Sequence, residues 1–114
     1  MIDREALIVN FCNKQKEFPI LLSINYFREF DELGCVVGNL GVILGKDLLN
    51  PDGEKLHLLF KDVRDLKFED LGRPVQLCVQ ITNITDCQIE GIHYYAEEEH
   101  SFSLYCKVFD YKVK

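Results

Sequence analysis

The sequence predicts an α+β fold that is mainly β, with one N-terminal helix followed by about seven antiparallel strands. Apolar residues recur at helical spacing only before Pro19, and after it they recur at every second position, as in strands with one buried face. Turn residues separate these runs at intervals of roughly eight to twelve residues, which is too short for the crossovers that parallel strands need. We therefore expect a β-sandwich or a strongly curled sheet with the helix at one end.

The helix is expected over residues 3–16. Asp3 can accept a hydrogen bond from the first turn, and Leu7 and Phe11 lie on one stripe at a spacing of four. Acidic residues near its start and lysines near its end match the helix dipole. Pro19 then separates the helix from the β-rich body.

The β-rich body is expected to span residues 19–110 of a chain that forms a single domain, 1–114. Its extended runs are predicted at 20–27, 35–44, 56–61, 64–68, 75–81, 89–95 and 102–109. The segment Asn50-Pro51-Asp52-Gly53 predicts a hairpin turn, because proline presets φ and glycine accepts a positive φ. Residues 83–86 are expected to form a loop.

The last two strands are expected to pair, with residues 96–100 as their connection. In the final strand the alternation predicts four residues that face the core: Phe102, Leu104, Cys106 and Val108. Cys106 is therefore expected to be a packed, unreactive thiol, while Cys78 has the outward parity of its strand.

The net charge limits the kinds of partner that the sequence predicts, and the cysteine content indicates the cellular compartment. The net charge of −6 opposes binding to phosphate backbones, so nucleic acid is not an expected partner. An acidic domain can attract a basic protein partner, although the same charge also simply keeps a small protein soluble. Five cysteines without a C-x-x-C pair suit a reducing cytoplasm, and neither a secretory signal nor a membrane span is found.

No catalytic or cofactor motif stands out, so no cofactor is expected and the sequence leans against an enzyme without excluding one. Residues 97–100 could supply carboxylate and imidazole ligands to a metal together with His93, Asp86 and Glu90. Adjacent residues at a hairpin tip point in different directions, however, and a solvated turn is the favoured interpretation. No metal site is therefore predicted.

Tyrosines and glutamates near the end of the chain form the candidate protein interface. Tyrosine is enriched at interface hot spots, and one member of the pair Tyr94-Tyr95 must face outward from a strand. The predicted interface residues are Tyr94, Tyr95, Tyr105, Glu97, Glu98 and Glu99. The alternative, slightly favoured, is that the rings pack beneath a second sheet.

Three segments carry a resemblance to a known group of proteins: residues 58–66, Tyr94 with Glu97-Glu98-Glu99, and residues 102–106. Over about residues 56–109 the chain resembles small bacterial domains grouped with the immunity proteins of polymorphic toxin systems. The resemblance implies a non-enzymatic cytoplasmic protein that neutralises a partner by binding it. An acidic surface would suit a basic, nuclease-type toxin.

Two other functions stay open from the sequence. One is a small-ligand-binding or catalytic domain with a pocket between sheets. The other is a structural subunit that buries its outward tyrosines in a homodimer.

Overall fold

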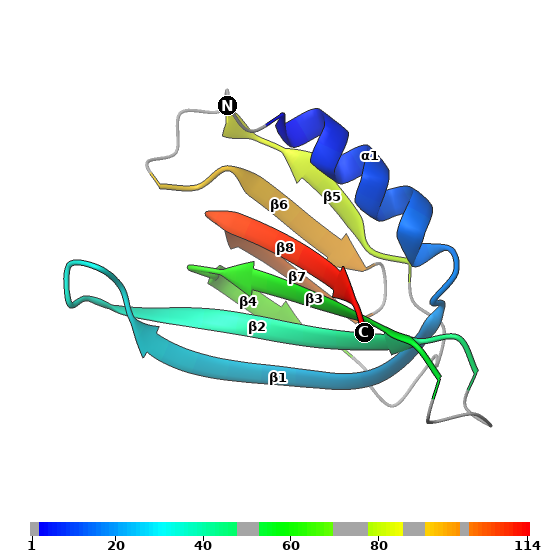
Figure 1. Cartoon of the computed structure of the whole chain (residues 1–114). Helices are drawn as coiled ribbons and strands as arrows, with labels where there is room; N and C mark the ends of the chain where they lie inside the picture. The colour runs from blue at the N-terminus through cyan, green and yellow to red at the C-terminus, as the bar shows by residue number, and fades with distance from the viewer. Residues whose placement is uncertain (1–2, 48–52, 70–77, 86–90, 99–100) are drawn as a thin grey trace.

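A computed structural model describes residues 3–47, 53–69, 78–85, 91–98 and 101–114. The described part contains one helix and eight strands, and all strand pairs are antiparallel, which confirms the predicted mainly β class (Figure 1). The elements are α1 (Arg4–Gln15), β1 (Ile20–Phe30), β2 (Val36–Gly45), β3 (Lys55–Lys61), β4 (Arg64–Phe68), β5 (Gln80–Asn83), β6 (Tyr94–Glu98), β7 (Phe102–Cys106) and β8 (Val108–Val113).

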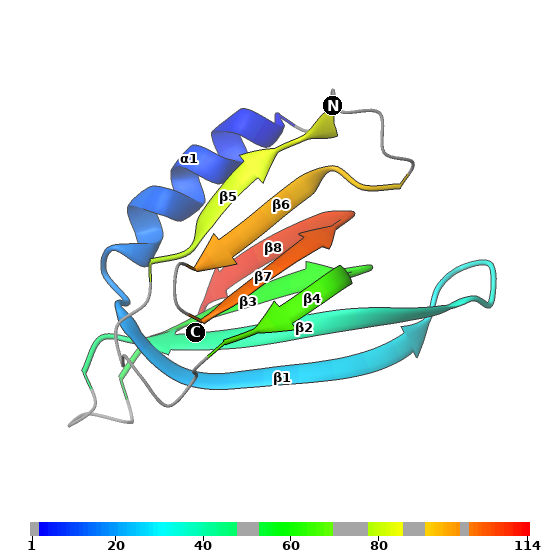
Figure 2. The same cartoon turned by 180° about the vertical axis from the view of Figure 1, so that it is seen from behind.

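The strands form two four-stranded sheets that share a corner. The first sheet has the order β1-β2-β3-β8, and the second has the order β4-β7-β6-β5. Only residues 62–63 separate β3 from β4, and only Lys107 separates β7 from β8. The two resulting bent strands stay paired across the corner, with a hydrogen bond of 3.1 Å from the Lys107 amide to the Lys61 carbonyl. The arrangement is thus a strongly curled sheet, seen from both sides in Figures 1 and 2.

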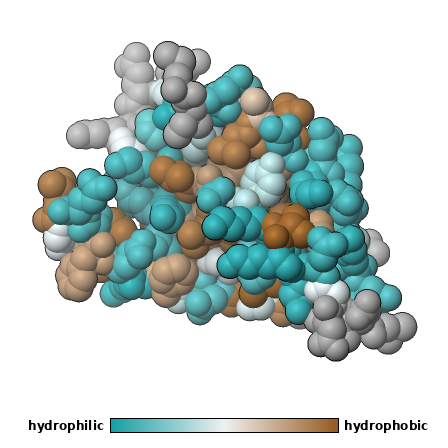
Figure 3. Space-filling model, viewed as in Figure 1, coloured by the Kyte–Doolittle hydropathy of each residue, from teal (hydrophilic) through white to brown (hydrophobic). Residues whose placement is uncertain are grey.

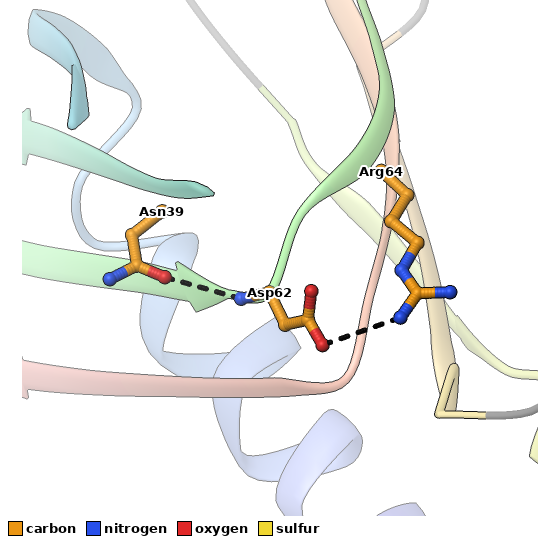
Figure 4. A network of polar contacts seen from close by, with 3 residues as sticks. All are labelled: Asn39, Asp62 and Arg64. Carbon is orange, nitrogen blue, oxygen red and sulfur yellow. Dashed lines mark hydrogen bonds and ion pairs between the residues drawn. The ribbon is translucent and has the colours of Figure 1, made fainter. Parts of the chain in front are cut away.

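Polar side chains fix the bend where β3 passes into β4 (Figure 4). Asp62 has a φ of 55°, a left-handed conformation that turns the strand. Its amide donates to Oδ1 of buried Asn39 at 3.2 Å, and its carboxylate lies 3.6 Å from the Arg64 guanidinium. Asn39 also donates to Glu29 Oε1 at 2.6 Å, so both ends of this buried amide have partners.

Helix α1 forms as the sequence predicts. The Asp3 carboxylate accepts from the Ala6 amide at 3.1 Å, and Phe11 is fully buried against the rings of Phe109 and Tyr111. At the last turn Gln15 reaches the start of the second sheet. Its side-chain amide donates to the Val79 carbonyl at 2.7 Å and accepts from the Val79 amide at 3.0 Å.

The core fills the space enclosed by the curled sheet and α1. Inward residues of both sheets meet there, and Phe109 lies at the centre, with its ring 4.8 Å from that of Tyr94 in an edge-to-face arrangement. The largest fully buried side chains are those of Phe11, Phe18, Phe60, Phe102, Phe109, Leu40, Leu44, Leu56, Leu58, Leu104, Val42 and Val79.

The predicted final strand is wrong beyond Cys106. Residues 102–109 form parts of two strands in different sheets, and the alternation shifts by one residue at Lys107. Val108, expected to face the core, is 43% exposed, whereas Phe109 is 2% exposed. The cause is the corner, because a single residue between two strands exchanges the faces that odd and even positions occupy.

Other boundaries also differ from the sequence prediction. β6 continues to Glu98, so residues 96–98 are not part of a connection; they pair with β7, and Ala96 is buried opposite Leu104. Asn83 belongs to β5 rather than to a loop. The predicted turn at residues 50–53 lies largely outside the described residues, although β2 and β3 on either side are paired antiparallel.

Candidate protein-interaction site

The predicted interface residues on β6 divide between the two faces of that strand. Tyr94, Ala96 and Glu98 point inward, and Tyr95 and Glu97 point outward. Tyr94 is 3% exposed, and burial raises the pKa of its hydroxyl. Its ring is part of the core, which was the alternative interpretation for this tyrosine.

Glu98 also serves the interior. It is nearly buried, and one carboxylate oxygen accepts from the Cys78 amide at 2.8 Å, which positions the chain just before β5. Glu99 lies outside the described residues. The outward part of the predicted interface therefore consists of Tyr95, Glu97 and Tyr105, which we call the tyrosine patch.

The tyrosine patch is a preorganised group on the outer face of the second sheet. Tyr95 and Tyr105 are cross-strand partners, and their ring centroids lie 4.9 Å apart at an interplanar angle of 49°. The Tyr95 hydroxyl donates to Glu97 Oε2 at 3.1 Å. Burial raises the pKa of Tyr95, and the hydrogen bond and charge of Glu97 add to the effect. Both rings are partly exposed, so they offer apolar area with little conformational freedom to lose.

Charges of both signs surround the patch. Glu97 is paired with Ser103, and on the far side of β7 Ser103 is paired with Lys67 while Tyr105 is paired with Arg64. Cross-strand partners project from the same face of a sheet. The patch therefore has an acidic side and a basic side, although the chain as a whole is acidic.

The cysteines and histidines do not assemble a reactive centre among the described residues. Cys106 is fully buried, and burial raises the pKa of its thiol to about 12, so the expected packed thiol is confirmed. Within the described residues no three His, Cys, Asp or Glu side chains come together as metal ligands would. Four members of the weighed metal cluster lie outside that part of the chain: Asp86, Glu90, Glu99 and His100.

A hollow of about 230 Å³ lies along β3 and β8. Its lining residues are His57, Leu59, Asp110, Tyr111, Lys112 and Lys114. It belongs to one sheet rather than to the space between the sheets, and it is smaller than the usual ligand cavity of about 300 to 1,000 Å³. This hollow is therefore not the pocket between sheets that the small-ligand alternative expects.

Sequence reasoning missed the most exposed apolar feature, the hairpin end formed by residues 26–37 of β1, β2 and their connection. Phe30 and Leu33 are 74% and 87% exposed, and Val36 is also exposed. Apolar groups of this end lie at the left of Figure 3, beyond the rest of the molecule in that view. The exposure arises because β3 pairs with β2 only as far as Leu40. A pattern of alternation cannot reveal that a neighbouring strand stops short.

By its fold the chain is a mainly β protein, with one helix packed against a strongly curled antiparallel sheet. A family model described as Immunity protein PIM8 matches residues 4–112. The chain belongs to the immunity protein PIM8 family, which confirms the resemblance found in the sequence. Neither the curated proteins nor the solved structures contain a match to the chain. In the described residues, no helix is long and apolar enough to cross a membrane.

Proposed function

We propose that this protein is a bacterial cytoplasmic immunity protein that neutralises a basic toxin by binding it through the tyrosine patch. The observation that carries the proposal is membership of the immunity protein PIM8 family over residues 4–112. The proposed inhibition is non-covalent. The bound chain occupies the active surface of the toxin, and this is sufficient to keep substrate away from it.

The tyrosine patch supports the choice of surface. The rings of Tyr95 and Tyr105 are already in contact, and Glu97 holds the Tyr95 hydroxyl, so little order has to be gained on binding. Tyrosines in such settings commonly account for a large share of interface energy. A basic side chain of the toxin can approach Glu97, whereas an acidic one can approach Lys67 or Arg64.

The net charge of −6 supports the choice of partner. A negative field raises the rate at which a basic protein is encountered, and rapid capture protects a cell that makes its own toxin. Electrostatic steering weakens with salt, so association with the toxin is expected to slow as ionic strength rises.

The test begins with the partner. The tagged chain is purified from its native host, and a co-purifying protein encoded beside its gene is expressed in a sensitive host with and without the chain. Growth arrest by that protein alone and growth in the presence of the chain are expected. Failure of the chain to bind or protect would refute the proposed function.

The surface is tested with the purified pair. Tyr95→Ala and Tyr105→Ala are each expected to weaken binding by about 10- to 30-fold, which corresponds to roughly 1.4 to 2 kcal/mol. Val9→Ala is the control, because Val9 is an exposed apolar residue on α1, outside the tyrosine patch. If both patch variants protect and bind like the wild-type chain, the patch is wrong while the inhibitory function stands.

A further inference from the structure

Strand β1 is a long edge that no described strand covers. It spans eleven residues at the end of the first sheet, and its only strand partner in the described part of the chain is β2. Every residue from 25 to 30 is exposed. The outer edge of such a strand presents backbone donors and acceptors in a row, and proteins usually cover or pair an edge of this length.

Apolar side chains accompany this edge on both faces. Tyr26 and Phe27 point to opposite faces of β1, and both are exposed together with Leu22 and Phe30. Beyond the strand, Leu33 continues the apolar surface at the hairpin end. Another β-strand matches this edge better than a helix or a small molecule does. A strand can hydrogen-bond to the exposed backbone groups and pack its side chains against the exposed rings at the same time.

The two ends of β1 carry opposite charge. Three acidic residues stand at the hairpin end together with a single arginine: Glu29, Asp31, Glu32 and Arg28. At the other end Lys16 and Lys46 are exposed, and the Lys46 ammonium lies 5.2 Å from the centre of the Phe18 ring. Glu17 at that end is paired with Lys14 at 3.3 Å, and Asp47 is also present, so the balance there is slightly positive.

We propose that the β1 edge is an interface between two copies of this chain, which pair antiparallel about a two-fold axis and join their first sheets into one sheet of eight strands. In an isologous contact each copy presents the same surface, so the acidic end of one β1 meets the basic end of the other twice. With the axis near Asn25, Phe30 of one copy pairs with Ile20 of the other, so the turn that carries Glu32 lies beside the start of the second copy's β1, where Ile20 is paired with Gly45 and Lys46 follows.

The charge pattern favours a second copy of the chain as the partner that pairs with the β1 edge. Within one chain the two ends of β1 lie about 33 Å apart, because a strand rises about 3.3 Å per residue, so the acids and the lysines are too distant to stabilise each other. The same antiparallel pairing sets Tyr26 opposite Ile24 of the second copy, a favourable aromatic and β-branched pair. The interface uses the first sheet, whereas the tyrosine patch lies on the second, so this inference does not depend on the proposed function.

The first measurement is the mass of the purified chain by sedimentation velocity and light scattering. At about 100 μM chain, a dimer with a micromolar Kd is almost fully formed. A mass near twice 13.3 kDa is expected, falling on dilution and at high salt. A monomer at that concentration would overturn the proposal.

Charge reversal identifies the interface. Glu32→Lys and Lys46→Glu are each expected to weaken dimer formation by about tenfold or more, because each places like charges together at two symmetric contacts. An equimolar mixture of the two variants is expected to dimerise again, since each mixed pair then has opposite charges at both contacts. Glu69→Lys, at an exposed position just after β4 of the second sheet, is the control and is expected to leave the mass unchanged.

The mixing experiment separates this interface from every other. Dimers that persist in both single variants, or singles that do not recover on mixing, would place the contact elsewhere and refute the β1 edge. Phe30→Ser gives an independent check, because loss of an exposed ring is expected to weaken the dimer without unfolding the monomer. If instead the chain is monomeric alone and Phe30→Ser impairs toxin binding, the edge serves the toxin and the second copy is wrong.

Discussion

The change of face at Lys107 predicts opposite effects on stability for substitutions at two adjacent residues, Val108 and Phe109. Phe109 is 2% exposed and packs against Phe11, Phe60 and Tyr94, whereas its neighbour Val108 is 43% exposed. Replacing Phe109 with Ala removes a ring from the centre of the core and is expected to cost about 4 kcal/mol. Val108→Thr keeps the branched shape and adds a hydroxyl that water can solvate, so its cost should stay within about 0.5 kcal/mol.

Urea denaturation followed by far-UV circular dichroism measures both variants. For a domain of this size the slope is about 1.5 kcal/mol per molar urea, so Phe109→Ala should lower the midpoint by roughly 2.7 M. Val108→Thr should lower it by no more than about 0.3 M. Phe109→Leu is a milder variant for the case in which Phe109→Ala does not fold, with an expected cost of about 1 to 1.5 kcal/mol.

The sequence alternation alone predicts the reverse order, with Val108 inside. If Val108→Thr costs more than Phe109→Ala or Phe109→Leu, a hydroxyl has been buried at position 108 and the corner at Lys107 is misplaced. Equal small effects at both positions would mean that β8 does not contribute its residues to the core.

Three other predictions concern the interior. Gln15→Met removes both hydrogen bonds to the Val79 backbone and is expected to lower the free energy of unfolding by about 2 to 4 kcal/mol, measured by urea denaturation. Asn13→Ala, at an exposed position of the same helix, should lower it little. Equal effects of the two variants would contradict the role of the Gln15 amide. Alkylation at pH 8 followed by peptide mass spectrometry should label exposed Cys35 and Cys78 rapidly and spare Cys106, because burial raises the pKa of its thiol to about 12; equal labelling in the folded chain would be inconsistent with that burial. Burial lowers the pKa values of His57 and His93, so the unfolded chain takes up more protons than the folded chain below about pH 6.5. The free energy of unfolding should therefore fall between about pH 7 and pH 5, and the fall should be smaller for His93→Gln; an identical pH dependence would show that His93 does not contribute.

The helix and most strands could be predicted because their residues repeat with a local period. Asp3 and the stripe through Phe11 are sufficient to place α1, and alternation is sufficient to place β3 and β7. The corner could not be predicted, since it depends on Asp62 taking a left-handed conformation and on one residue, Lys107, joining two sheets. Both are consequences of pairing between distant segments.

The candidate site was predictable only in part. Alternation requires that one of Tyr94 and Tyr95 faces outward, but the choice depends on which face of β6 meets the core. Glu98 looked like a member of a solvated turn, and only the position of Cys78 shows why it is held inside. Phe30 is exposed because β3 pairs with β2 only as far as Leu40. That depends on a strand about thirty residues further along the chain, so the residues around Phe30 cannot reveal it.

The shared corner has a consequence for how such a protein can change over time. Two bent strands carry the backbone through both sheets, so the angle between the sheets depends on residues 62–63 and 107 and on the side chains of Asn39 and Arg64, which contact Asp62. Substitutions on the outer face of one sheet can accumulate while the other sheet keeps its shape. A lineage can thus change the residues at positions 95 and 105, the surface proposed to bind the toxin, and retain its β1 edge unaltered.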